Sequence, residues 1–88
     1  MTEDQERVEY YEIIGVGRTS VNPSGLARRR FTPAGRVDET LQRDLSWHPT
    51  SAITRWEYGN LSGELASISE AEAGELIERF REKWSQEG

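Results

Sequence analysis

Several kinds of residue are missing or rare in this 88-residue sequence, and each absence excludes a class of site. There is no cysteine, which excludes disulfide bridges, thiolate chemistry and cysteine-ligated zinc. The only histidine is His48, and a single imidazole does not make the usual zinc site. No apolar run approaches the roughly 18 residues that span a bilayer, and the acidic start has no apolar signal region. We expect a cytoplasmic protein that uses no metal, cofactor or membrane.

A recognisable set of catalytic residues is also missing. No serine lies in a Gly-x-Ser-x-Gly motif, and most carboxylates fall near the N-terminus or on the solvent side of a predicted helix. Carboxylates placed in this way rarely act as a pair across a cleft. We interpret His48 as a structural loop residue and predict that the protein is not an enzyme.

Lysine is almost absent, since ten of the eleven basic residues are arginine. We attribute this first to the codon usage of a GC-rich genome. The net charge is −5, but it is unevenly distributed along the chain. Residues 13–36 carry five arginines and no acid, whereas residues 1–12, 37–64 and 65–88 sum to −4, −3 and −3. One basic block therefore lies within an acidic protein.

The strongest structural signal lies at the end of the chain. Ser69 and Glu72 have the spacing of a capping box, which predicts a helix from Ser69 to Trp84. Gly74 in its interior costs about 1 kcal/mol relative to alanine, so either it is simply tolerated or a neighbouring backbone or a partner approaches closely there. A helix of this length is not stable alone in water, so another element must cover its apolar side. That side consists of Ala73, Leu76, Ile77, Phe80 and Trp84.

Strand patterns occupy most of the remaining sequence. Val8–Val16 is rich in β-branched and aromatic residues and predicts an interior strand. Leu26–Thr32 and Val37–Gln42 predict a hairpin around the turn Pro33–Gly35, although Val37, Leu41 and Leu45 also fit helical spacing.

The segments after this hairpin complete the predicted sheet. His48-Pro49 is expected to break the strand ladder, because proline has no amide hydrogen. Alternation in Ala52–Tyr58 predicts a further strand, and Glu64–Ile68 a short last one. We expect at least two of the three tryptophans to lie in the core.

These elements predict an α+β fold, an antiparallel sheet of four to five strands with one C-terminal amphipathic helix packed on one face. Residues 8–88 are expected to form a single small domain after a disordered leader, residues 1–7.

The basic block suggests a binding surface. In a strand, Arg28 and Arg30 share one face and Arg29 shares the other with Phe31. With Arg36 on the next strand, such a hairpin can present guanidinium groups beside aromatic rings, which suits a nucleic-acid backbone.

A structural interpretation of the same arginines is also open. Glu9, Glu12, Asp38 and Glu39 on adjacent strands can pair with them and neutralise the block. A net charge of −5 also opposes long-range attraction to DNA.

Three functions remain as hypotheses. The leading one is a non-enzymatic interaction or regulatory module that binds a protein partner through a sheet edge or the arginine-rich hairpin. The second is nucleic-acid binding through Arg28–Phe31, and the third is a small-molecule pocket near Trp47, His48, Trp56 and Tyr58. A homodimer is also possible. The candidate binding residues are Arg28, Arg29, Arg30, Phe31, Arg36, Trp47, His48 and Trp56.

The chain contains several short sequence patterns that can be compared together. They are Tyr10-Tyr11-Glu12, Leu26-Ala27-Arg28-Arg29, Trp47-x-Pro49-Thr50, Trp56-Glu57-Tyr58-Gly59, Gly63-Glu64-Leu65 and Ile68-Ser69-Glu70-x-Glu72-Ala73. Taken together, they resemble a group of short actinobacterial-type proteins of unknown function. The resemblance covers Val8 to Trp84 and implies a standalone small α+β domain in a high-GC bacterium. It implies no catalytic residue and no ligand.

Overall fold

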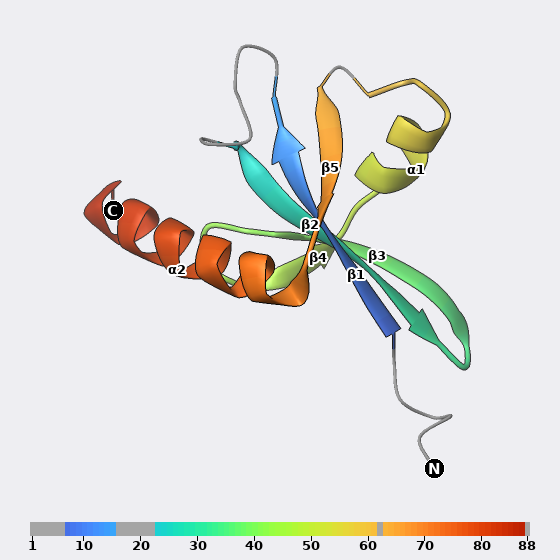
Figure 1. Cartoon of the computed structure of the whole chain (residues 1–88), viewed down its shortest axis with the longest axis horizontal. Coiled ribbons are helices and arrows are strands. Elements are labelled where there is room, and N and C mark those ends of the chain that lie inside the picture. The colour runs from blue at the N-terminus through green and yellow to red at the C-terminus, as the bar shows by residue number, and fades with distance from the viewer. Residues whose placement is uncertain (1–6, 16–22, 62, 88) are drawn as a thin grey trace.

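The computed structural model of the chain describes residues 7–15, 23–61 and 63–87 (Figure 1). Within these ranges the predicted α+β fold is confirmed, with a five-stranded antiparallel sheet and a C-terminal helix. The elements are β1 (Arg7–Ile14), β2 (Gly25–Thr32), β3 (Gly35–Leu41), β4 (Trp47–Pro49), α1 (Ala52–Glu57), β5 (Glu64–Ile68) and α2 (Glu70–Glu87).

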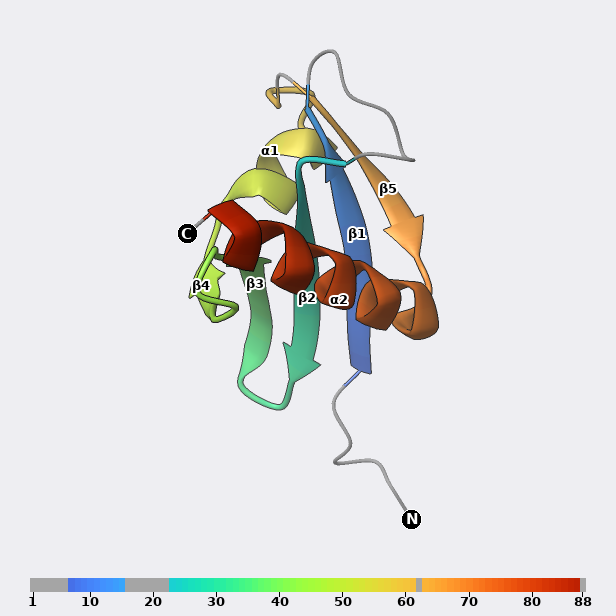
Figure 2. The ribbon, with the colours of Figure 1, turned by 90° about the vertical axis from the view of Figure 1, so that its left-hand side faces the viewer.

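The strands lie in the order β4-β3-β2-β1-β5, so β4 and β5 form the two edges. Figure 1 shows the helices on opposite sides of the sheet, and Figure 2 shows α2 crossing β1 and β2. We call the two sides of the sheet the α2 face and the α1 face. The predicted interior position of the first strand agrees with this order, since β1 pairs with β2 and with β5.

Strand β2 supplies both faces of the sheet because its side chains alternate. Leu26 points to the α2 face and Ala27 to the α1 face, and both are fully buried. The cluster on the α2 face consists of Leu26, Leu41, Ala73, Leu76 and Phe80. The smaller cluster on the α1 face consists of Ala27, Ile53 and Leu65.

Helix α2 follows the sequence prediction closely. The Ser69 amide donates to Glu72 Oε1 at 2.9 Å and the Glu72 amide donates to Ser69 Oγ at 3.0 Å, which completes the capping box. Ala73, Leu76 and Phe80 of the apolar stripe are buried, and Ile77 and Trp84 pack against them. The helix continues to Glu87, three residues beyond Trp84.

The strand predicted for Ala52–Tyr58 is wrong, because this segment forms helix α1. Ala52 and Ile53, which are adjacent in sequence, are both buried, and Trp56 lies one turn later beside Tyr11. Adjacent buried residues are compatible with a helix but not with a strand that has one solvent face. The Ala52 amide also bonds to Thr50 Oγ1 at 3.1 Å, which supports the start of the helix.

The expected break at His48-Pro49 is also wrong, because Trp47–Pro49 forms β4 and pairs with β3. A proline is tolerated there because β4 is an edge strand, and Pro49 is its last residue. Residues 42–46 form the turn before β4, in which Leu45 has a φ of 66°. The helical alternative for Val37–Leu45 therefore does not form.

Two smaller expectations also change. No tryptophan is fully buried: Trp47 and Trp84 pack against the core, whereas Trp56 is 37% exposed. Arg7, which the sequence assigned to the leader, is the first residue of β1 and pairs with Phe31. Residues 1–6 of the predicted leader, and residues 16–22 between β1 and β2, lie outside the described residues.

Candidate functional site

The centre of the arginine block is a buried ion-pair cluster on the α1 face. Arg29 is only 4% exposed and lies opposite Asp38 of β3. Its Nε and one terminal nitrogen donate to the two Asp38 oxygens at 2.8 and 3.0 Å, and a second terminal nitrogen donates to Glu57 of α1 at 2.8 Å. Arg29 thus ties α1 to the sheet.

Electrostatic effects in this cluster follow from these contacts. The hydrogen bond from Arg29 lowers the pKa of Asp38 and that of Glu57, and the two carboxylates raise the pKa of Arg29. All three groups are therefore charged near neutral pH. Burial raises the pKa of the neighbouring Tyr11, whose hydroxyl also donates to Glu9 at 3.0 Å.

The other two arginines of β2 lie on the α2 face and share one carboxylate. Arg28 Nε and Arg30 Nε donate to Glu39 Oε1 at 2.9 and 3.1 Å. The Arg28 guanidinium also lies 4.0 Å from the centre of the Trp47 ring. These contacts hold the β2–β3 pair together.

The remaining members of the predicted hairpin surface lie towards the turn. The Arg7 guanidinium is 4.2 Å from the centre of the Phe31 ring, so one side of this ring is covered. Arg36 is exposed opposite Phe31, and its charge helps to lower the pKa values of Asp38 and Glu57. Thus Arg28, Arg29 and Arg30 each have a carboxylate within 3.1 Å, and the geometry gives nucleic-acid binding through them no support.

The aromatic residues predicted to line a pocket are not brought together. Trp47 packs on the α2 face, whereas Trp56 belongs to α1 and contacts Tyr11 on the opposite face. His48 is exposed and hydrogen-bonds Ser46 Oγ through Nε2 at 2.8 Å, and Tyr58 is 78% exposed. Neither of the two hollows described below is lined by any of these four side chains.

Strand β5 is the feature that the candidate list from the sequence missed. It pairs with β1 on one side, and no described strand pairs with its other side. Figure 2 shows it at the margin of the sheet. Its five residues include no proline, lysine or arginine, which are the residues that commonly protect an edge strand from pairing.

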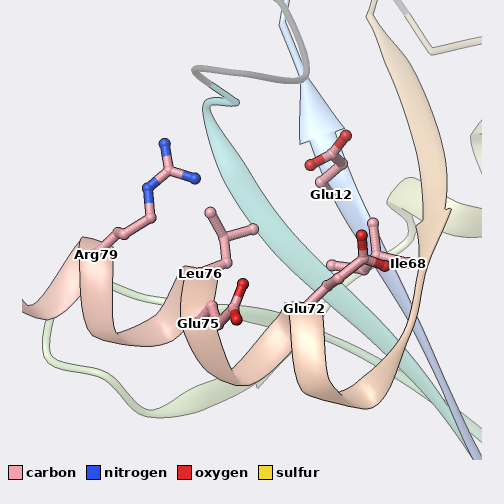
Figure 3. A pocket seen from close by; sticks show the side chains of 6 residues that line it. All are labelled: Glu12, Ile68, Glu72, Glu75, Leu76 and Arg79. Atoms are coloured by element: carbon pink, nitrogen blue, oxygen red, sulfur yellow. The ribbon is translucent and has the colours of Figure 1, made fainter.

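A groove of about 230 Å³ lies beside β5, between the α2 face and the first turns of α2. Its apolar residues are Ile68, the last residue of β5, and Leu76. Figure 3 shows the carboxylates of Glu12, Glu72 and Glu75 around these two side chains, with Arg79 at the end away from β5.

Glu12 is the carboxylate that β1 contributes to this groove. Its pKa is raised because it is partly removed from water and because Glu72 carries the same charge. Arg79 acts in the opposite direction but does not outweigh these effects. Ionisation of Glu12 is therefore less favourable in the folded chain than in the unfolded chain.

A sequence signal for this acidic edge was present. Residues 63–78, which include β5 and the first half of α2, contain five glutamates and no lysine or arginine. The sequence prediction gave more weight to the arginine block because it differs from the rest of the chain, yet the fold pairs those arginines internally.

A second hollow of about 180 Å³ lies where the turn before β4 meets the end of α2. It is lined by Leu45, Trp84 and polar residues of both segments. Leu45 has an uncommon conformation for a residue with a side chain, and its packing against the core cluster offsets that cost.

Comparisons with known proteins give no further assignment: no family model, curated protein or solved structure matches the chain. Among the described residues, no group of three or more histidine, cysteine or acidic side chains is placed to hold a metal ion. Neither α1 nor α2 combines the length and the apolar character that a bilayer span requires. The actinobacterial resemblance stays a prediction.

Proposed function

We propose that this chain is a non-enzymatic interaction module that binds an extended segment of a protein partner along the open edge of β5. The single observation that supports this is that no described strand pairs with the outer side of β5, a strand without the proline, lysine or arginine that commonly protects an edge. A partner segment that adds to such an edge gains a row of main-chain hydrogen bonds.

The opposite edge is a poorer binding surface. Strand β4 has only three residues, and its last residue is Pro49, which has no amide hydrogen to donate. The arginine-rich hairpin, the other binding surface that the sequence suggested, has its central guanidinium groups occupied by carboxylates. The β5 edge is therefore the better candidate for the binding surface. The absence of cysteine fits a reducing compartment, and we include a cytoplasmic location in the proposal.

A displayed library of random nonapeptides, selected on the purified chain, tests this proposal. We expect the selected pool to be enriched in peptides with β-branched residues at alternate positions, because such peptides favour an extended strand. Amide chemical shifts of the chain, measured with one selected peptide, should change most at residues 64–68. If no peptide is enriched above background, the proposal is wrong.

A pair of serine-to-lysine variants shows where the peptides bind. Ser67 is exposed on β5, and Ser67→Lys adds a residue that protects natural edge strands. We expect this variant to reduce the enrichment about tenfold or more. Ser51→Lys makes the same charge change next to α1, where Ser51 is exposed and its side chain makes no cap hydrogen bond. Equal loss in both variants would contradict binding at β5.

A further inference from the structure

The chemistry around β5 narrows the class of partner, provided that the proposed edge binding is correct. Glu64, Ala66 and Ile68 of β5 share the α2 face, because their partners on β1 include Tyr10, which packs in the cluster beneath α2. A strand added to β5 places every second side chain on this same face. Those side chains point towards the groove that begins at Ile68.

The groove has the size for one side chain rather than for a metabolite. Its volume of about 230 Å³ lies below the roughly 300–1,000 Å³ of ordinary small-molecule sites. Its apolar surface comes from Ile68 and Leu76, and its polar groups on the side nearer β5 are carboxylates (Figure 3). Such a site suits a lysine or arginine, whose aliphatic stem packs on apolar surface while the charged end stays among acidic groups.

Ala66 leaves a path from the edge to this site. It lies on β5 directly opposite Glu12 of β1, on the α2 face. An added strand lies about 9.5 Å from β1, which is two strand spacings. Because alanine has only a methyl group, a long side chain can extend over it towards the Glu12 carboxylate. A larger residue at this position would close the path.

The charge around the edge indicates that the partner segment is positively charged. Glu64 lies on the edge strand itself, and Glu12, Glu72 and Glu75 line the groove beside it, against Arg79 as the one basic residue of its lining. The raised pKa of Glu12 adds support, since a further cation would relieve its repulsion from Glu72.

We propose that the partner segment is an extended basic peptide, one lysine or arginine of which lies over Ala66 and Ile68 with its charged end among Glu12, Glu72 and Glu75. A second copy of this chain is a poor occupant, because pairing β5 with β5 would bring two acidic edges together.

The composition of the selected nonapeptides tests this inference separately from the proposed function. On the unmodified chain, we expect lysine or arginine to be enriched at one fixed position of the extended pattern. The double variant Glu12→Gln/Glu75→Gln should lose this basic preference but keep the β-branched pattern. Glutamine is close in shape to glutamate, and the substitution at Glu12 removes its charge repulsion from Glu72, so we expect the double variant to fold.

A matched variant controls for net charge. Glu78 lies one turn after Glu75 on α2 but does not line the groove, and it pairs with Arg81 at 3.4 Å. Glu78→Gln should leave the basic preference unchanged. For one selected peptide, replacing the enriched lysine with norleucine should weaken binding about threefold or more, and the norleucine peptide should be insensitive to Glu75→Gln.

Three other results of these experiments would contradict the inference. Enrichment without a basic preference, or a basic preference that survives the double variant, overturns this inference and leaves edge binding in place. A homodimer that Ser67→Lys dissociates in sedimentation experiments also overturns it, because the edge then belongs to a second copy. A library that yields no enriched peptide overturns the proposed function and this inference together.

Discussion

Arg29 is the residue on which the α1 face depends most. It is the shared partner of Asp38 and Glu57, and its own side chain is only 5% exposed. A buried carboxylate that loses its partner costs far more free energy than a surface ion pair contributes. The sequence analysis listed Arg29 as a candidate binding residue, but its charge stabilises the fold by pairing with Asp38 and Glu57.

Replacing this guanidinium should destabilise the whole chain. For Arg29→Met, which keeps an unbranched side chain, we expect the free energy of unfolding to fall by about 3 kcal/mol, because the Asp38 carboxylate stays buried without its partner. Urea unfolding followed by circular dichroism measures this change.

Two controls accompany that experiment. Arg29→Lys should lose less stability, since it keeps the charge but not the two-pronged contact with Asp38. Arg81→Met removes an exposed arginine of α2, whose side chain is 56% exposed, and should change the unfolding free energy by less than about 1 kcal/mol. If all three variants were equally stable, the ion-pair cluster would not have the role assigned to it.

At the scale of whole elements, α2 illustrates what the sequence predicts well. Its capping box, its stripe and its spacing all favour one structure, and each depends only on neighbours along the chain. The hairpin of β2 and β3 was predictable for a similar reason, since the Pro33–Ala34 turn joins adjacent segments.

The wrong predictions concern features that depend on contacts between segments far apart in the sequence. Ala52, Trp56 and Tyr58 fit an alternating pattern, but Ala52 and Ile53 are both buried because α1 packs against β2 and β5. Pro49 lies in a strand only because β4 is at an edge, and edges are decided by the arrangement of all strands. The open side of β5 was unpredictable for the same reason.

Two glycines provide a test at this scale. A methyl group on Gly74 would meet no atom within 4 Å, so the close neighbour considered from the sequence is absent among the described residues. We expect Gly74→Ala to stabilise the protein by about 0.5–1 kcal/mol, because alanine loses less backbone entropy in a helix. Thermal unfolding of the variant measures this gain.

Gly63 is the matched opposite case. A methyl group at Gly63 would lie 2.5 Å from the backbone carbonyl oxygen of Ile14. A backbone atom cannot move aside as the end of a flexible side chain can. We expect Gly63→Ala to be destabilising by about 1–3 kcal/mol, because the entrance to β5 must shift. A gain of stability in Gly63→Ala as well as in Gly74→Ala would contradict the close packing described at the start of β5.

For the molecule as a whole, the contribution of the ion-pair cluster to stability should be visible as a loss of stability at acidic pH. Arg29 holds the pKa values of Asp38 and Glu57 below those of the unfolded chain. The stabilisation is therefore present above the unfolded pKa values, near pH 4, and is lost as the pH falls through the folded values. We expect unfolding free energy to decrease steeply below about pH 4.

The Arg29→Met variant makes this dependence specific. Without the guanidinium, the folded pKa values of both carboxylates move up, so the acid limb of its stability curve should be flatter than that of the unmodified chain. Urea titrations at several pH values between 2 and 7 measure both curves. Parallel acid limbs would show that other carboxylates determine the acid sensitivity.

The unequal ends of the sheet have a consequence for stoichiometry. Polymerisation through sheets requires each unit to offer two free edges, so that one more copy can always join. Of the two edges among the described strands, β4 is short and ends in proline, whereas β5 has no such protection. Pairing of two copies through β5 would therefore leave no second suitable edge, so copies of this chain do not extend into a fibre by this route.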